Sequence, residues 1–481
     1  MEHFDVLIVG AGLSGIGAGV HLQQRCPERS FAVLEGRERL GGTWDLFRYP
    51  GVRSDSDMYT LGYRFRPWKG AKSIADGPSI LSYLQETARE HGIDRKIRFR
   101  HRVKRAAWST KDALWTVDAQ VGESNEAVQF SCNFLFTCGG YYRYDAGYTP
   151  EFAGRKRFKG RVVHPQHWGD DVDHANQRVV VIGSGATAVT LVPALAQTAA
   201  HVTMLQRSPT YMIGLPSHDA IATGLRRVLP ARLAYGLTRW KNLSLGMFIY
   251  RLCRRRPALA KRILLGGAQR WLGPDADVAT HFTPRYNPWE QRLCLVPDGD
   301  FFKAVRAGRA SVVTDTIESF TETGIKLTSG AELDADIIVT ATGLALELAG
   351  GLQVSVEGVP VDWPATLNYK GLMYSGVPNF AAVFGYTNAS WTLKADLISE
   401  YVCRLLNHMA THGLRQCMPC IADPLMPTEP WVDFSSGYLQ RELHRFPKQG
   451  TREPWKLNQN YLRDLFALRY GRLDDGAMTF A

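Results

Sequence analysis

The stretch Val6-Leu7-Ile8-Val9-Gly10-Ala11-Gly12-Leu13-Ser14-Gly15 decides the fold, and Val179-Val180-Val181-Ile182-Gly183-Ser184-Gly185-Ala186-Thr187-Ala188 repeats its pattern. Each begins with an apolar, β-branched run that is typical of a parallel strand buried on both faces. Each then leads through a glycine loop into a helical segment and another strand, expected at Ile16–Arg25 with Ser30–Leu34 and at Val189–Gln197 with His201–Leu205. The sequence therefore predicts an α/β fold with two Rossmann-like domains.

The glycine spacing in both loops fits the pyrophosphate of a dinucleotide. The first glycine of each loop permits a tight turn, and the second lets the backbone approach the phosphates. The third position must be small so that helix and strand can pack, and Ala188 replaces glycine there in the second loop. The helix behind each loop offers free N–H groups and a favourable dipole. One such loop is a weak signal, but two in the same structural context predict two dinucleotide sites.

The ends of the second strands distinguish the two ligands. Glu35 ends the strand of the first unit, where a carboxylate accepts hydrogen bonds from ribose hydroxyls. Arg207 and Ser208 occupy the equivalent place in the second unit, and a guanidinium with a hydroxyl suits a 2′-phosphate. These residues predict FAD at the first loop and NADPH at the second.

Composition indicates a folded protein with anionic ligands. Of the 481 residues, 45% are apolar and 21% charged, as in globular proteins of two or three domains. Lys and Arg outnumber Asp and Glu by 57 to 46, and without a nucleic-acid-binding motif we attribute this excess to two polyanionic cofactors. Eight scattered cysteines favour a reducing cytoplasm, and no apolar run approaches the roughly 20 residues that span a bilayer.

The order of the segments predicts the domain organisation. Strands expected at Ile97–Val103, Trp115–Val117 and Phe134–Thr137 end at Cys138-Gly139-Gly140, and Asp336–Gly343 forms a matching exit. We expect the FAD-binding domain in residues 1–145 and 341–481, the latter including the C-terminal region. The NADPH-binding domain is expected in 153–212 and 289–340, with a helical insertion at 213–288.

The insertion carries a basic run, Arg251–Arg262, after an apolar stretch. This pattern fits a helix on a membrane surface, and it also fits a solvated basic face beside an ordinary buried face. The second interpretation is favoured by the sequence, and peripheral membrane contact stays open as the alternative.

The segment before the second unit resembles the type I Baeyer–Villiger monooxygenases. Their fingerprint is F-x-G-x-x-x-H-x-x-x-W followed by Pro or Asp, and this chain matches it at Phe158, Gly160, His164 and Trp168. Gly169 departs from it, and the sister flavin-containing and N-hydroxylating monooxygenases typically have Tyr or Phe in place of Trp168. Gln291–Cys294 resembles the stretch that carries the family's active-site arginine. The runs Gly41–Tyr59, His164–Trp168 and Tyr386–Trp391 especially resemble the subgroup that includes the ethionamide-activating monooxygenase.

This resemblance implies an oxygenation reaction with Arg292 and Asp55 as catalytic residues. In the family, NADPH reduces the flavin and O₂ adds at its C4a atom to give a peroxide. A permanently charged guanidinium stabilises that anion without losing its proton, and a carboxylate orients the guanidinium. The expected substrates are ketones, which give esters or lactones, and sulfides or thioamides, which are oxidised at sulfur.

The same resemblance assigns cofactor contacts residue by residue. Those implied for FAD are Gly10, Gly12, Ser14, Gly15, Glu35, Thr43, Trp44, Asp45, Leu46, Asp55 and Val103. Those implied for NADPH are Arg53, Ser54, Asp55, Gly183, Ser184, Gly185, Ala186, Thr187, Ala188, Val189, Arg207 and Ser208. His164 is either a catalytic acid/base or, as we favour, part of a hinge between the domains. No metal site is expected, because His164 and His167 have no third ligand nearby.

Two other functions compete with oxygenation. One is a flavin oxidoreductase that passes electrons from NADPH to a disulfide or quinone, and the missing cysteine pair beside either loop counts against the disulfide form. The other is a non-catalytic flavin redox sensor, which would leave Arg292 and Asp55 without a purpose.

Overall fold

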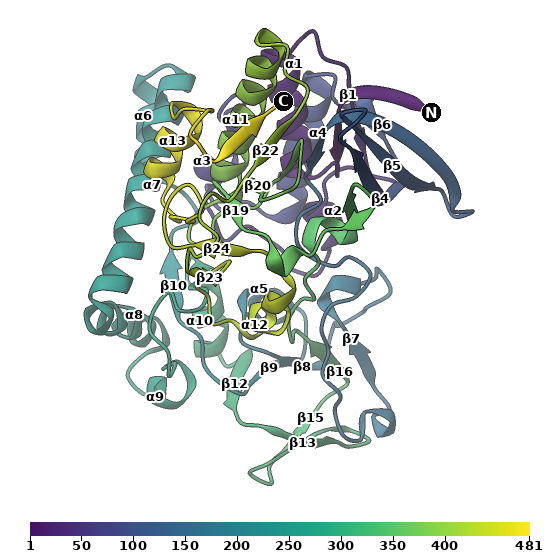
Figure 1. The fold of residues 1–481 in the computed structure, drawn as a ribbon. Coiled ribbons are helices and arrows are strands. Elements are labelled where there is room, and N and C mark those ends of the chain that lie inside the picture. The colour runs from purple at the N-terminus through teal and green to yellow at the C-terminus, as the bar shows by residue number, and fades with distance from the viewer.

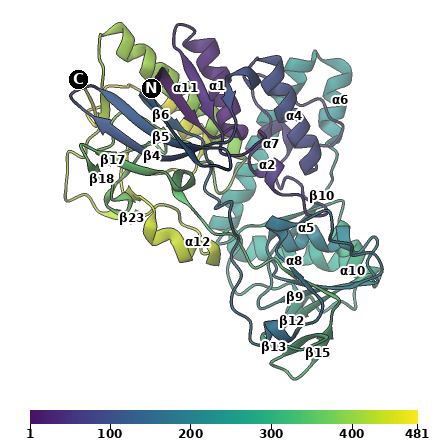
Figure 2. The same cartoon turned by 90° about the vertical axis from the view of Figure 1, so that its right-hand side faces the viewer.

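The computed structural model describes residues 1–481 and contains two α/β units, with a layer of helices along one side (Figures 1 and 2). The smaller sheet is parallel throughout, the larger one combines parallel and antiparallel strands, and each glycine loop follows a strand with parallel neighbours on both sides. The α/β fold with two dinucleotide-type units that the sequence predicts is confirmed. None of the helices combines the length and the apolar character that crossing a membrane requires.

The larger sheet has the strand order β18-β17-β4-β5-β6-β1-β2-β3, and β21 also pairs with β6. Strand β1 lies between β2 and β6 in parallel register, with Ile8 opposite both Val33 and Phe136. These central positions are fully buried, which explains their continuous apolar sequence. The strands are β1 (Glu2–Val9), β2 (Phe31–Leu34), β3 (Ile97–Arg98), β4 (His101–Ser109), β5 (Leu114–Val121), β6 (Glu126–Thr137), β17 (Gln353–Val356), β18 (Val359–Pro360) and β21 (Phe380–Ala382).

The second sheet is entirely parallel, in the order β12-β9-β8-β16-β7. Its strands are β7 (Arg161–Val163), β8 (Arg178–Ile182), β9 (His201–Gln206), β12 (Ala310–Thr314) and β16 (Ile337–Thr340). Short pairs and a three-stranded sheet complete the β structure: β10 (Met212–Leu215) with β11 (Cys294–Pro297), β13 (Ile317–Phe320) with β14 (Gly324–Leu327) and β15 (Glu332–Asp334), β19 (Asn368–Tyr369) with β20 (Met373–Tyr374), β22 (Cys417–Pro419) with β25 (Met478–Phe480), and β23 (Thr428–Pro430) with β24 (Lys448–Gly450).

The helices pack on these sheets and on one another. They are α1 (Leu13–Arg25), α2 (Thr43–Leu46), α3 (Met58–Leu61), α4 (Gly77–Glu90), α5 (Ala186–Leu195), α6 (Ala220–Val228), α7 (Ala231–Arg255), α8 (Pro257–Leu272), α9 (Val278–His281), α10 (Asp300–Arg306), α11 (Trp391–Thr411), α12 (Gly437–Glu442) and α13 (Tyr461–Arg469). The largest core cluster lies between the first sheet and helices α1, α4 and α11. Helices α6 to α9 form the insertion, whose ends are held together by the parallel pair β10 and β11.

Three local expectations are corrected by the structure. The strand expected at Ile97–Val103 is two strands, because Arg100 has a positive φ of 59° and turns the chain between β3 and β4. Helix α1 begins at Leu13 rather than Ile16, and α5 begins at Ala186 rather than Val189. In both loops the second glycine is the extended N-cap residue, so the helix begins immediately after it.

Candidate functional site

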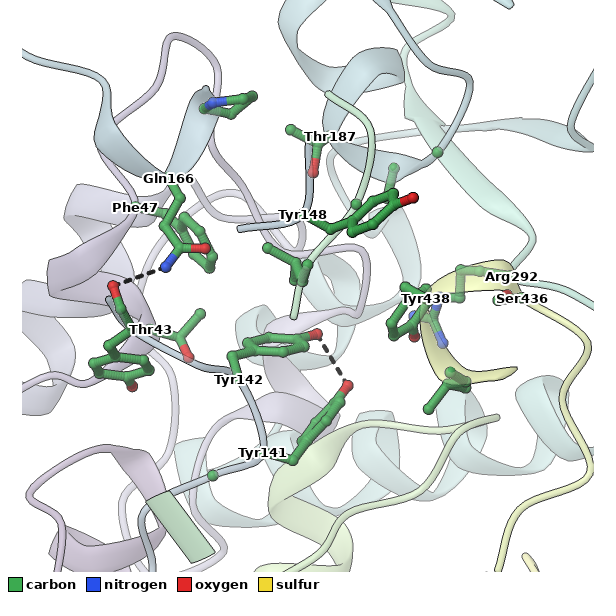
Figure 3. A pocket seen from close by; sticks show the side chains of 18 of the residues that line it. Thr43, Phe47, Tyr141, Tyr142, Tyr148, Gln166, Thr187, Arg292, Ser436 and Tyr438 are labelled. Atoms are coloured by element: carbon green, nitrogen blue, oxygen red, sulfur yellow. Dashed lines mark hydrogen bonds between the residues drawn. The ribbon is translucent and has the colours of Figure 1, made fainter. Parts of the chain in front are cut away.

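One large cavity connects the two glycine loops. It has a volume of about 1290 Å³. Its wall comes from both sheets, from the segments that directly follow β6 and β16, and from the segment around α12. Ligand pockets in proteins usually hold roughly 300–1,000 Å³. The cavity is therefore large enough for more than one ligand, and Figure 3 shows part of its wall.

The first loop is shaped by close backbone contacts. Gly10 has a φ of +100°, and a Cβ there would come within 2.9 Å of the Cys138 carbonyl oxygen at the exit of β6. A Cβ on Gly15 would lie 1.8 Å from the Gly10 carbonyl oxygen, so helix α1 can pack this closely only with glycine. Gly12 faces Gly42 across the loop, and a Cβ on Gly12 would be 3.5 Å from the Cα of Gly42. The loop forms a narrow backbone cradle of the kind a pyrophosphate requires.

Glu35 lies at the cavity wall, directly after the end of β2. Its carboxylate accepts the N–H of Ala11 at 2.7 Å and the N–H of Arg37 at 2.9 Å. Burial raises the pKa of Glu35, and these two N–H groups and the Arg37 charge limit the rise. Each carboxylate oxygen keeps a lone pair for a further donor, such as a ribose hydroxyl.

The second loop repeats this geometry against the other exit segment. Gly183 has a φ of +132°, and a Cβ there would lie 2.3 Å from the Ala341 carbonyl oxygen. Gly185 faces open space, as close approach of a phosphate requires. The Ser184 hydroxyl donates to the Ser208 carbonyl at 2.8 Å, which ties the loop to the strand end that carries Arg207. Arg207 and Ser208 are exposed residues of the cavity wall.

Most of the predicted cofactor residues border this cavity, and several do not. Those in the wall are Gly10, Gly12, Ser14, Glu35, Thr43, Trp44, Arg53, Ser54, Asp55, Val103, Gly183, Ser184, Gly185, Ala186, Thr187, Arg207 and Ser208. Gly15, Asp45, Leu46, Ala188 and Val189 lie behind it.

Two of the wall residues are tied to distant parts of the chain. Ser14 accepts the indole N–H of Trp391 at 2.8 Å. Arg53 forms an ion pair with Asp300 at the start of α10, which joins the two units beside the second loop. Behind the wall, the buried Asp45 carboxylate forms ion pairs with the guanidinium groups of Arg37 and two other arginines, and these ion pairs hold the arginine side chains in place.

The Arg292 guanidinium is held in the cavity wall by two hydrogen bonds. Its Nε donates to the Asp55 carboxylate at 2.8 Å, and its Nη1 donates to the Thr387 carbonyl at 3.1 Å. Burial opposes the charge of Arg292, but the attraction and hydrogen bond of Asp55 outweigh it and raise the pKa of the guanidinium. The carbon at its centre lies 5.6 Å from the centroid of the Trp289 ring. Arg292 and Asp55 are 237 residues apart in the sequence, and the fold brings them together.

The four fingerprint residues have different environments. His164 borders the cavity, and its Nε2 lies 3.3 Å from the Gly343 carbonyl oxygen while its Nδ1 accepts the Gln166 N–H at 3.2 Å. Burial lowers the pKa of His164, so the neutral ring with its proton on Nε2 satisfies both contacts. Phe158 is buried against Phe320 in a small core cluster. Gly160 and Trp168 also lie outside the cavity.

The Gln166 side chain holds the segment that leads from the first unit to the second. Its amide donates to the carbonyls of Arg143 and Tyr144 at 2.8 and 2.9 Å. Gly343 and Arg143 lie in the two segments that connect the units, which we call the crossings. His164 and Gln166 together therefore fix both crossings. Gln166 was not among the predicted site residues, since only its position within the fingerprint segment could have suggested it.

Sequence reasoning also missed an aromatic part of the wall beside Arg292. Tyr141 and Tyr142 follow the β6 exit and share a hydrogen bond of 2.9 Å between their hydroxyls, and Tyr438 of α12 lies next to Arg292 (Figure 3). Burial raises the pKa of all three phenols, so they stay protonated at neutral pH. The consecutive tyrosines after Gly139-Gly140 were the available signal.

The comparisons with known proteins agree with this geometry. The flavin-binding monooxygenase-like family profile matches residues 74–240, and that of the NAD(P)-binding Rossmann-like domain matches residues 8–69. The chain is 56% identical to the FAD-containing monooxygenase EthA of Mycobacterium tuberculosis over 481 residues, which cover 100% of this chain and 98% of the relative. It is 48% identical to the probable FAD-binding monooxygenase AlmA of Acinetobacter baylyi, covering 100% and 96%.

Two solved structures show the same fold. An oxidized steroid monooxygenase bound to NADP has a TM-score of 0.74 at 25% identity, with 87% of each chain covered. A cyclohexanone monooxygenase with bound ε-caprolactone has a TM-score of 0.78 at 18% identity, with 100% of each chain covered.

Proposed function

Since the chain belongs to the family of FAD-containing monooxygenases, we propose that it is a Baeyer–Villiger enzyme that uses NADPH and O₂. It inserts one oxygen atom next to the carbonyl of a ketone, giving an ester or lactone, and transfers oxygen to the sulfur of sulfides or thioamides. The observation that carries this proposal is the Arg292–Asp55 pair in the cavity that also contains both glycine loops.

The residues around the cavity suit FAD and NADPH, which are the cofactors of this enzyme. The backbone cradle at Gly12 and the carboxylate of Glu35 would hold the pyrophosphate and ribose of FAD. The open loop at Gly185 and the cationic Arg207 would hold the pyrophosphate and the 2′-phosphate of NADPH. When bound, the flavin reduced by NADPH supplies the electrons that activate O₂.

Arg292 is suited to stabilise negative charge on oxygen during the transfer. A guanidinium has five N–H donors. Two N–H groups of Arg292 are used by Asp55 and Thr387, so the others are available to an oxygen in the cavity. Because its pKa is raised further by Asp55, Arg292 keeps its proton and acts as a fixed positive charge.

The tyrosines beside Arg292 favour the transfer of oxygen to the substrate over the release of hydrogen peroxide. Tyr141, Tyr142 and Tyr438 are neutral and present aromatic surface to the cavity. A wall of this kind excludes water from the reacting groups and strengthens the field of the Arg292 charge.

The cysteines near the cavity do not support electron transfer to a disulfide. Cys138 and Cys294 lie in its wall, and both are free and buried. Burial raises the pKa of Cys138 far above its ordinary value and that of Cys294 to about 12. Both thiols are therefore protonated and poorly nucleophilic, unlike those of a dithiol reductase.

The test is product formation with labelled oxygen. The FAD-loaded protein is given NADPH and ¹⁸O₂ with a linear ketone, a cyclic ketone or a sulfide, and NADPH use, hydrogen peroxide and products are measured. We expect esters, lactones and sulfoxides that carry one ¹⁸O atom, in near proportion to NADPH used. NADPH oxidation that yields only hydrogen peroxide across the panel, or faster reduction of a quinone without O₂, would overturn the proposal.

A further inference from the structure

Three consecutive helices carry the whole positive excess of the chain. Residues 220–272, which form α6, α7 and α8, contain twelve Lys and Arg and neither Asp nor Glu. The net charge of the full chain is +11, so the other residues together have a net charge of −1. The net positive charge therefore resides in this helical layer and not at the two glycine loops that are predicted to bind the cofactors, which corrects the attribution made from composition.

Most of these cations are not used by the protein itself. Within the layer only Arg239, Lys241 and Arg254 form ion pairs with carboxylates. Arg226 and Lys261 donate to backbone carbonyls. The other seven are exposed and form no ion pair: Arg227, Arg232, Arg251, Arg255, Arg256, Arg262 and Arg270. An isolated solvated face usually mixes both signs of charge, which this layer does not.

The same layer presents large apolar side chains to solvent. Nine of the fifteen exposed large hydrophobic residues of the chain lie in residues 220–272. On α7, Leu233, Leu237, Trp240 and Phe248 are 46 to 62% exposed, and their spacing places them on one side of the helix, which we call the apolar stripe. The opposite side, with Tyr235, is buried against the first unit. Helix α7 forms one edge of the molecule in Figure 1, with α6 and α8 packed at its two ends.

We propose that the apolar stripe and the arginines around it bind the surface of an anionic phospholipid bilayer. A helix that lies in a membrane interface combines an exposed apolar side with Lys and Arg that reach the lipid phosphates. A second copy of the chain fits this face poorly, because a symmetric contact would bring two strongly positive layers together. A nucleic acid would neutralise the arginines but would leave the apolar stripe in water.

Vesicle co-sedimentation of the FAD-loaded protein tests this proposal. We expect it to sediment with phosphatidylglycerol-containing vesicles, to stay in solution with pure phosphatidylcholine, and to be released by 1 M salt, where the Debye length falls to about 3 Å. Replacing Arg251, Arg255 and Arg256 by Gln should weaken binding roughly 100-fold, from about five-fold for each charge near the surface. The matched control replaces Arg155, Lys156 and Arg157, another exposed basic run, by Gln and should bind like the unmodified protein.

The contribution of the apolar stripe is tested separately. The triple variant L233S, L237S, F248S should bind at least about ten-fold more weakly at the same salt concentration. Replacing the exposed Leu425 by Ser should have no effect. Quenching of tryptophan fluorescence by brominated lipid should lose a component in Trp240→Leu, because Trp240 lies in the stripe.

Three results would overturn the proposal. One is equal binding by the Arg251–Arg256 variant and the Arg155–Arg157 control. Another is a stable dimer in solution that the serine variant disperses, while vesicles leave the unmodified protein in the supernatant. The third is tighter binding to DNA of the same charge density than to the vesicles. None depends on oxygenation, so these results are independent of the proposed activity.

Discussion

Replacing Arg292 by Ala should separate folding and cofactor binding from oxygen transfer. The side chain is 27% exposed and Asp55 is 40% exposed, so Asp55 stays solvated when its partner is removed. Partly exposed ion pairs contribute up to about 1 kcal/mol, and the loss of stability should be of that size. In the transition state, by contrast, a positioned donor to a developing oxyanion contributes roughly 2.7–4 kcal/mol, or a factor of 10² to 10³ in rate.

The assay for this variant is the ratio of oxygenated product to NADPH consumed, measured together with bound FAD and hydrogen peroxide. Arg292→Ala should retain FAD and reduction by NADPH, but ester and sulfoxide should fall by the factor above, with hydrogen peroxide in their place. Arg178→Ala is the control, because Arg178 is also paired with carboxylates but lies outside the cavity. If Arg292→Ala makes product at a rate within about three-fold of the unmodified protein, the catalytic role of Arg292 is refuted.

Three further predictions concern the cofactor sites and the crossings. Arg207→Ala should raise the KM for NADPH roughly 10- to 100-fold, the equivalent of one charge-assisted hydrogen bond, with little change for NADH, whereas equal effects would exclude a contact with the 2′-phosphate. Gly15→Ala places a Cβ 1.8 Å from the Gly10 carbonyl, so the purified variant should lack FAD, and a full flavin spectrum would contradict this. Burial lowers the pKa of His164 below 6.5, so the unfolded state binds the proton first as pH falls. The Tm should therefore drop more in the unmodified protein than in His164→Gln between about pH 7.5 and 5.5, and parallel curves would exclude this linkage.

The sequence was sufficient for the fold and the family because their signals are local. The loops at Gly10 and Gly183 each lie within ten residues of the strand and helix that they connect. Their spacing reflects a steric requirement. A Cβ at either position would collide with the segment that leaves the neighbouring strand of the same sheet. The relatives at 56% and 48% identity confirm the monooxygenase family that the motifs indicated.

The parts that the sequence did not reveal depend on contacts between distant residues. Spacing says nothing of the hydrogen bond between Arg292 and Asp55, and only the family resemblance suggested it. The ion pairs of the buried Asp45 carboxylate with three arginines behind the cavity wall could not be read from the sequence either. The exposure of Phe248 was also hidden, because an apolar residue in a helix is more often buried, and only the structure shows which side of α7 faces solvent.

The helical insertion contacts both units of the fold. From its place in the sequence we expect it in the NADPH-binding domain. Helices α8 and α9 pack into the core of that second unit, through residues such as Leu272 and Val278, whereas α7 packs on the first unit. Arg239 is buried and donates to the carbonyls of Tyr59 and Gly62, each at 2.7 Å, beside Asp396. Breaking such a buried pair costs roughly 3–5 kcal/mol, so helix α7 stays with the first unit. Because α8 packs on the second unit, the insertion joins the five-stranded sheet that carries Arg207 to the first unit at a third place, besides the two connecting segments that His164 and Gln166 hold.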